Sequence, residues 1–275
     1  MRWKSRLVWL GLLILLWLFC SGTALADTLV DRLSQFPNWQ SKPIVQPSKG
    51  DLVYPEWFAG EWIATTTLID LVAPLAPDIT TPGFESNRKF LNQPISFKVR
   101  FTKSNPSGLM ALVPTLNPHQ SIVSDRAFNG QSLAEAYLGD RAILAVKVDP
   151  HNPNRQITLL QGNRQLASTV TARAIEAPTP EQFVTSELFQ QEFLGTPQVY
   201  FNEVENTTAY THLPLTAEHP EITADQATAI YLSPQDPDYF KTIDPNSPFS
   251  SPRPVALYRY QMEFRRSNEF IPLGF

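Results

Sequence analysis

The chain has 275 residues, of which 26 are acidic and 22 are basic, so its formal net charge at pH 7 is −4. This acidic balance argues against a nucleic-acid partner. Twenty-five prolines against eleven glycines disfavour long helices, because proline fixes φ and has no amide hydrogen. The composition is typical of one β-rich domain with stiff loops.

The N-terminus has the pattern of a secretory signal peptide. Arg2, Lys4 and Arg6 precede an apolar run over residues 7–19, and small residues stand at Ala24 and Ala26. We therefore predict a signal peptide over residues 1–26, with an uncleaved membrane anchor as the alternative. Cleavage would remove three basic residues and no acidic one, which moves the net charge from −4 to −7. It would also remove the single cysteine, so disulfides and thiol chemistry are excluded from the mature chain.

Residues 27–56 are predicted to form a short helix and an extended lead-in. Leu29, Leu33 and Phe36 recur at helical spacing, which predicts a helix over residues 28–36 that ends at Pro37. Several prolines follow. We expect a single β-barrel domain to occupy residues 57–275.

Strand patterns recur along that domain. The clearest is residues 95–102, where Ile95, Phe97, Val99 and Phe101 alternate with polar residues. A turn at Gly162-Asn163-Arg164 predicts a hairpin. Further strands are predicted over residues 63–70, 142–149, 155–161, 165–176, 198–213, 226–232 and 254–264.

One longer helix is predicted over residues 179–194. Thr179-Pro180-Glu181-Gln182 fits a capping box, and Gly195 fits a helix stop. Val184 with Leu188, and Phe189 with Phe193, are four residues apart. A shorter helix is expected over residues 132–139. About eight antiparallel strands then suit a closed barrel or a sandwich.

Gly60-Glu61-Trp62, at the start of the first strand, resembles the lipocalin (calycin) signature. That resemblance implies an antiparallel eight-stranded barrel in which Trp62 plugs the closed end and an arginine packs across its ring. Arg259, Arg265 and Arg266 could supply the cation, and we take Gly60, Trp62 and Arg265 as the structural latch. The expected fold is thus mainly β, a lipocalin-like barrel with one or two short helices.

The chain also resembles an uncharacterised family of exported cyanobacterial and chloroplast proteins. The segments that carry this resemblance are residues 183–187, 202–210 and 257–260. It implies no activity, but it implies a location in the periplasm or the thylakoid lumen.

Two groups of residues are candidate binding sites. Tyr258 and Tyr260, with Phe97 and Phe101, could line a cavity for an apolar ligand, and a packed core is the alternative interpretation. Asp125, Arg126 and Asn129 form a polar cluster in a predicted loop, which could bind a ligand or form a surface ion pair.

Motifs of catalysis and metal binding are absent from the sequence. The four histidines lack helical metal-pair spacing, and no phosphate loop or nucleophile elbow occurs. Glu203 and Glu205 could be a carboxylate pair, but two glutamates on a solvent-facing strand are the ordinary case. We therefore expect no metal and no cofactor.

These patterns lead to a functional hypothesis. We expect a non-enzymatic exported β-barrel that binds a hydrophobic small molecule or serves as an accessory to a photosynthetic membrane complex. The alternative is an enzyme, an isomerase or a hydrolase, with its site at the barrel mouth.

Overall fold

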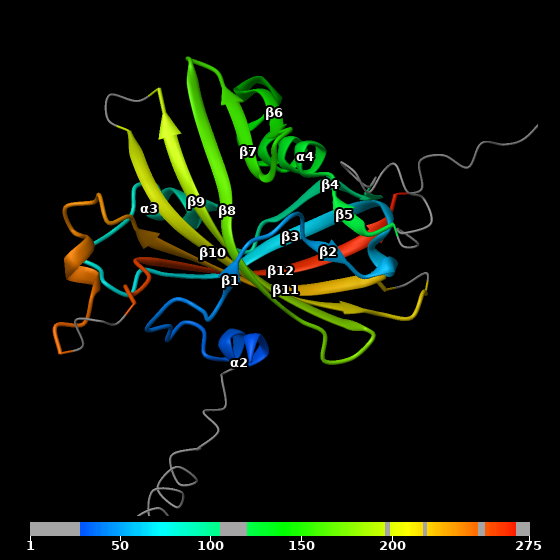
Figure 1. Ribbon diagram of the computed structural model, residues 1–275, viewed down its shortest axis with the longest axis horizontal. Helices are drawn as coiled ribbons and strands as arrows, with labels where there is room; N and C mark the ends of the chain where they lie inside the picture. Colours follow the sequence, from blue (N-terminus) through cyan, green and yellow to red (C-terminus); the bar gives the residue numbers. More distant parts are fainter. Residues whose placement is uncertain (1–27, 105–119, 196–198, 217–218, 247–250, 268–275) are drawn as a thin grey trace, which may run out of the picture.

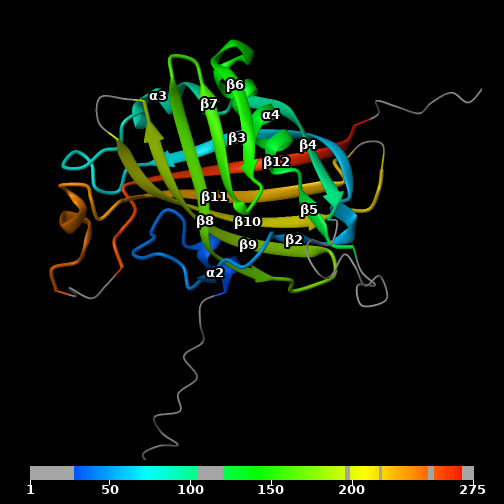
Figure 2. The same cartoon turned by 45° about the horizontal axis from the view of Figure 1, so that its top comes forward.

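The computed structural model describes residues 28–104, 120–195, 199–216, 219–246 and 251–267, so the predicted signal peptide lies outside the described residues. The described residues form one 12-stranded sheet in the order β2-β5-β4-β3-β12-β11-β10-β9-β8-β7-β6, with β1 paired to β8. The sheet curls into an open half-barrel (Figures 1 and 2). The mainly-β prediction is confirmed, whereas the closed eight-stranded barrel is wrong, because the end strands β2 and β6 do not pair with each other.

All pairs between the named strands are antiparallel. The strand bounds are β1 Gln46–Pro47, β2 Val53–Tyr54, β3 Gly60–Val72, β4 Pro94–Lys103, β5 Ile122–Ser124, β6 Ile143–Asp149, β7 Asn152–Leu160, β8 Arg164–Glu176, β9 Gln182–Leu194, β10 Tyr200–His212, β11 Ile222–Leu232 and β12 Ala256–Arg266.

The helices are few and mostly short. Their bounds are α2 Leu29–Ser34, α3 Phe84–Asn87 and α4 Arg126–Leu138, with single 3₁₀ turns η1 Glu56–Phe58, η2 Arg88–Phe90, η5 Asp140–Ala142 and η6 Tyr239–Thr242. The predicted helix over 28–36 therefore exists as α2. The shorter helix predicted over 132–139 is the second half of α4, which begins six residues earlier.

The predicted helix over 179–194 is wrong, because these residues form strand β9. β9 lies between β8 and β10 and pairs with both along its length. A spacing of four residues places two side chains on one face of a helix and equally on one face of a strand. The pairs Val184–Leu188 and Phe189–Phe193 therefore did not distinguish the two structures, and the pairing with two neighbouring strands decides the outcome.

Apolar residues pack on both faces of the sheet. At one end of the concave face lies a cluster that includes Leu52, Phe58, Trp62, Phe101 and Phe183. On the outer face, Leu33, Phe36 and Trp39 from α2 and the segment after it cover Ala227, Ala229, Tyr231 and Leu257. Figure 1 shows α2 outside the curved sheet. The lead-in thus closes the outer face of the sheet.

Glu205 faces this covered outer surface, so the expectation of two solvent-facing glutamates is wrong for Glu205. Its side chain is fully buried, and Arg32 of α2 donates from Nη2 to Oε2 over 2.7 Å. The Tyr231 hydroxyl donates to the same oxygen at 2.7 Å. The neighbouring Glu203 pairs with Lys42 at 2.6 Å. These contacts hold the lead-in against β10 and β11.

Helix α4 lies at the opening of the half-barrel and packs against both β4 and β6 (Figure 2). Gly130 of this helix also lies close to β7, because a Cβ there would be 2.6 Å from the amide nitrogen of the Gln156 side chain. The helix therefore covers a strand edge that the short strand β5 leaves largely unpaired.

Candidate functional site

The end of the half-barrel where β3 begins is closed by Trp62. The indole is fully buried and its N–H donates to the Phe58 carbonyl oxygen at 2.7 Å. The guanidinium carbon of Arg266 lies 3.8 Å from the centre of the Trp62 ring. Arg266 Nη1 also donates to the Ala59 carbonyl oxygen at 2.6 Å. This arrangement fixes the entry into β3.

The cation over Trp62 is Arg266, and the choice of Arg265 is wrong. Side chains alternate between the faces of a strand, so neighbours on β12 point in opposite directions. Arg265 is half exposed and lies 3.8 Å from Glu263. Gly60 has φ +116°, and a Cβ there would lie 2.8 Å from Arg266 Nη1. The latch therefore comprises Gly60, Trp62 and Arg266.

The four aromatic residues predicted to line one cavity belong to two packed clusters. Phe97 and Phe101 pack with Trp62 at the closed end. Tyr258 and Tyr260 pack with other residues, among them Leu68 and Phe84. Tyr258 and Phe101 are buried. The packed-core interpretation of these four residues fits the structure better than a common ligand cavity.

The polar residues Asp125 and Asn129 belong to the start of a helix and not to a loop, because Asp125 is the N-cap of α4 and Asn129 lies in its first turn. The Asp125 carboxylate caps the helix by accepting from the Phe128 amide, and it binds Arg100 at 2.6 Å. The Asn129 side chain accepts from the Arg100 amide at 2.7 Å and donates to the Arg100 carbonyl oxygen at 3.0 Å. The Asn129 side chain thus makes the two hydrogen bonds to the Arg100 backbone that a neighbouring strand would otherwise make.

Arg126 turns instead toward β9 and the lead-in. Its guanidinium lies 3.1 Å from Asp51 and 3.5 Å from Glu187, and Arg173 lies 3.0 Å from the same Glu187 oxygen. Arg173 also donates to Asn154 at 2.7 Å. Two cations here face two carboxylates, so the group forms a charge-balanced brace between α4, the lead-in and β7 to β9.

Sequence reasoning found Arg126 but missed its partners. Asp51 is 75 residues away from Arg126 and Glu187 is 61 residues away. Beside the brace, burial raises the pKa of the Tyr54 hydroxyl well above its usual range, and the nearby Tyr210 and Glu187 add to the effect. No local spacing of residues could have signalled these contacts.

Two hollows lie at the other end of the half-barrel, where β3 and β11 end and where β10 and β12 begin. The larger hollow has a volume of about 630 Å³ and is lined by Pro74, Leu75, Ala76, Asp78, Ile79, Lys241 and Arg253. The smaller has a volume of about 430 Å³ and is lined by Val199, Tyr200, Phe201, Ser233, Gln235, Asp236 and Pro237. We call this region the loop end. Neither hollow is lined by the aromatic residues that the sequence suggested.

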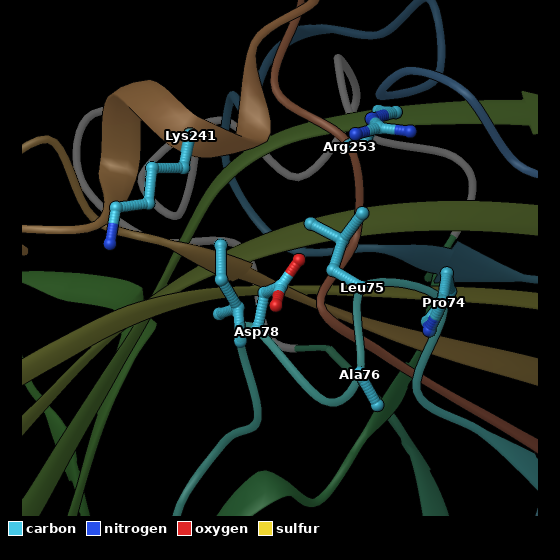
Figure 3. A pocket seen from close by; sticks show the side chains of 7 residues that line it. Pro74, Leu75, Ala76, Asp78, Lys241 and Arg253 are labelled. Atoms are coloured by element: carbon cyan, nitrogen blue, oxygen red, sulfur yellow. The ribbon is translucent and has the colours of Figure 1, made fainter.

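The larger hollow combines apolar and charged walls (Figure 3). Residues 74–79 supply Leu75, Ile79 and Asp78. Lys241 comes from η6, and Arg253 comes from the segment that leads into β12. The sequence predicted no strand or helix over residues 71–94 or 233–253, and proline-rich connections carry no periodic pattern that would mark a site.

Two features are absent from the described residues. Among them, no group of three or more His, Cys, Asp or Glu residues is arranged to hold a metal ion. None of the helices that they form is long and apolar enough to cross a membrane.

The fold and the candidate site define a mainly-β protein, an antiparallel half-barrel with a latch at one end and two hollows at the other. The chain belongs to the family described as a domain of unknown function, DUF6816, which matches residues 47–268. That range begins within β1 and extends beyond β12, so it includes both hollows. No curated protein and no solved structure matches the chain.

Proposed function

We propose that this protein is a non-enzymatic exported binding protein that holds a hydrophobic small molecule at its loop end. The larger hollow carries the proposal. Its volume of about 630 Å³ falls within the range of roughly 300–1,000 Å³ that small-molecule sites occupy. Pro74, Leu75, Ala76 and Ile79 supply an apolar wall for the ligand.

Binding is favoured over catalysis by the residues that line this hollow. They include one carboxylate and two cations but no histidine, serine, threonine or cysteine. General acid–base or nucleophilic chemistry needs a base or a nucleophile beside the reacting group. Among the described residues that line the hollow, Asp78 and Lys241 are the candidates, and Lys241 is engaged by Asp238 at 2.6 Å. The carboxylates of the brace are engaged by arginines.

Native mass spectrometry of the full chain, purified from its own host and followed by pigment and lipid extraction, tests this proposal. We expect a bound apolar molecule in the wild type and in a Leu144→Asp control, where the changed residue is exposed on β6. Leu75→Asp should lose the molecule while its circular dichroism stays unchanged. Ligand-free wild type, or equal occupancy in both variants, would contradict the proposal.

An accessory role at a photosynthetic membrane complex is a second candidate function. Exposed apolar side chains at the same loop end favour it, because Phe240 is 78% exposed and Val199 is 49% exposed. Phe240→Ser should then abolish co-migration with the complex on native gels of solubilised thylakoid membranes. Leu215→Ser, equally exposed in the connection between β10 and β11, is the matched control and should co-migrate like wild type.

A further inference from the structure

Arg253 is held in a fixed position at the larger hollow. Its backbone amide donates to the Thr242 carbonyl oxygen at 3.0 Å, and the amide of Val255 donates to Ile230 at 2.8 Å. Pro254 and Val255 on its C-terminal side are fully buried. The guanidinium therefore projects from a rigid segment into the lining of the hollow.

The half-buried side chain of Arg253 contains one nitrogen that lacks an acceptor. Its Nε is buried, and no hydrogen-bond partner for it exists among the described residues. A buried donor without an acceptor destabilises the protein, because it has lost its water and gained nothing in exchange. The rest of this half-buried side chain lines the hollow and is open to an acidic ligand there.

The acidic residues near the hollow engage Lys241 instead. Lys241 lies 2.6 Å from Asp238. The pKa of Lys241 is raised, first by the hydrogen bond to Asp238 and further by the charges of Asp238 and Asp78. No described acidic residue forms an ion pair with Arg253. In Figure 3, Leu75 and Asp78 lie between Lys241 and Arg253.

We propose that the larger hollow binds an anionic amphiphile whose acidic group pairs with Arg253 while its apolar part lies against Leu75 and Ile79. The proposal rests on the binding function proposed above and adds the charge of the ligand. A carboxylate, sulfonate or phosphate offers two oxygens to the planar guanidinium, which is the geometry that arginine recognises best.

The test compares two ligands of equal chain length on the full chain by isothermal titration calorimetry at about pH 8. Dodecanoate carries the acidic group, and methyl dodecanoate lacks it. We expect dodecanoate to bind the wild type more tightly than the ester. Arg253→Gln should weaken dodecanoate binding by about tenfold to a hundredfold and leave the ester unchanged.

Two further variants control for the loss of any surface cation and for unfolding of Arg253→Gln. Arg141→Gln removes an exposed cation from η5 and should bind both ligands like the wild type. Arg253→Lys keeps the charge and should retain a preference for dodecanoate even if Arg253→Gln unfolds, which circular dichroism would reveal. Equal affinity of the wild type for the two ligands, or a preference that survives in folded Arg253→Gln, overturns the proposal.

The possible results distinguish failure of the anionic site from failure of the proposed binding function. If the wild type binds neither ligand, the proposed binding function fails together with the inference. If it binds both ligands equally, the binding function stands and the anionic site fails. Co-sedimentation with phosphatidylglycerol vesicles, and not with phosphatidylcholine vesicles, would identify the acidic group as a lipid headgroup. Arg253-dependent binding of dodecanoate alone would identify a free amphiphile.

Discussion

Arg266 and Trp62 are register partners across the β12–β3 pair, with the guanidinium carbon 3.8 Å from the centre of the indole ring. One residue ends the last strand and the other lies at the start of the first long strand. Because Trp62 is fully buried, Trp62→Ala should lower the free energy of unfolding by ~3–5 kcal/mol. Urea denaturation measures this loss. Trp57→Ala, at a partly buried position, should cost clearly less.

Arg266 should contribute more to stability than its neighbour. Arg266→Ala removes the ring contact, the hydrogen bond to Ala59 and the 2.9 Å ion pair with Glu221. We expect a loss of about 1–2 kcal/mol, since the side chain is partly exposed. Arg265→Ala should stay within ~0.5 kcal/mol of wild type. Equal losses in the two variants, measured by chemical denaturation, would contradict the assignment of the cation.

Asn129 should protect the backbone amide of Arg100, at the edge of β4, from hydrogen exchange. Asn129→Ala leaves the N–H of Arg100 without its acceptor, which should cost ~1–3 kcal/mol. The Arg100 carbonyl oxygen still accepts from the Asp125 amide at 3.0 Å. Hydrogen exchange of the Arg100 amide should accelerate, because it would open directly to water. Gln131→Ala, an exposed change on the same helix, is the control and should leave that exchange rate unchanged.

Arg32 and Glu205 should behave as a coupled pair. Arg32→Leu or Glu205→Leu leaves one buried charge unpaired, and each single change should cost ~3–5 kcal/mol. The double variant should lose much less than the sum, because no unpaired charge remains. A double-mutant cycle by urea denaturation gives the coupling energy, and strict additivity would argue against the pair.

Tyr210 should make the protein less stable in alkali. Burial raises the pKa of its hydroxyl to about 12, a hydrogen bond with Thr208 opposes this, and Glu187 adds to it. The unfolded value is about 10, so the folded state holds the proton more tightly. Its stabilising contribution is complete below about pH 10 and is lost as pH rises toward about 12. Tyr210→Phe should show a shallower decline in unfolding free energy over that window.

Strand positions were predictable from local pattern. Alternation over residues 95–102 indicated β4, observed at Pro94–Lys103, and the turn around Gly162 lies between β7 and β8 as predicted. β9 was not predictable, because its apolar spacing suits a helix as well as a strand. In addition, residues 179–182, at and just before its start, have the sequence of a helix capping box. Only pairing with β8 and β10 decides between the two, and that information is not local.

The site was less predictable than the fold. Trp62 stood out because it follows a glycine at the start of a strand. Arg126 was noticed, but the carboxylates that it binds lie on segments distant in sequence. The same limit applies to Arg253. Its hollow forms where residues 74–79, η6 and the segment before β12 meet, and none of these segments has a periodic pattern.

The pairing of β3 with β12 has a consequence for when the protein can fold. Residues 60–72 find their partner strand in residues 256–266, so one seam of the sheet cannot form until residues 256–266 have been synthesised. Non-local pairing of this kind folds slowly, because a long loop must close before the contact forms. The nascent chain therefore stays without its latch until Arg266 has been synthesised.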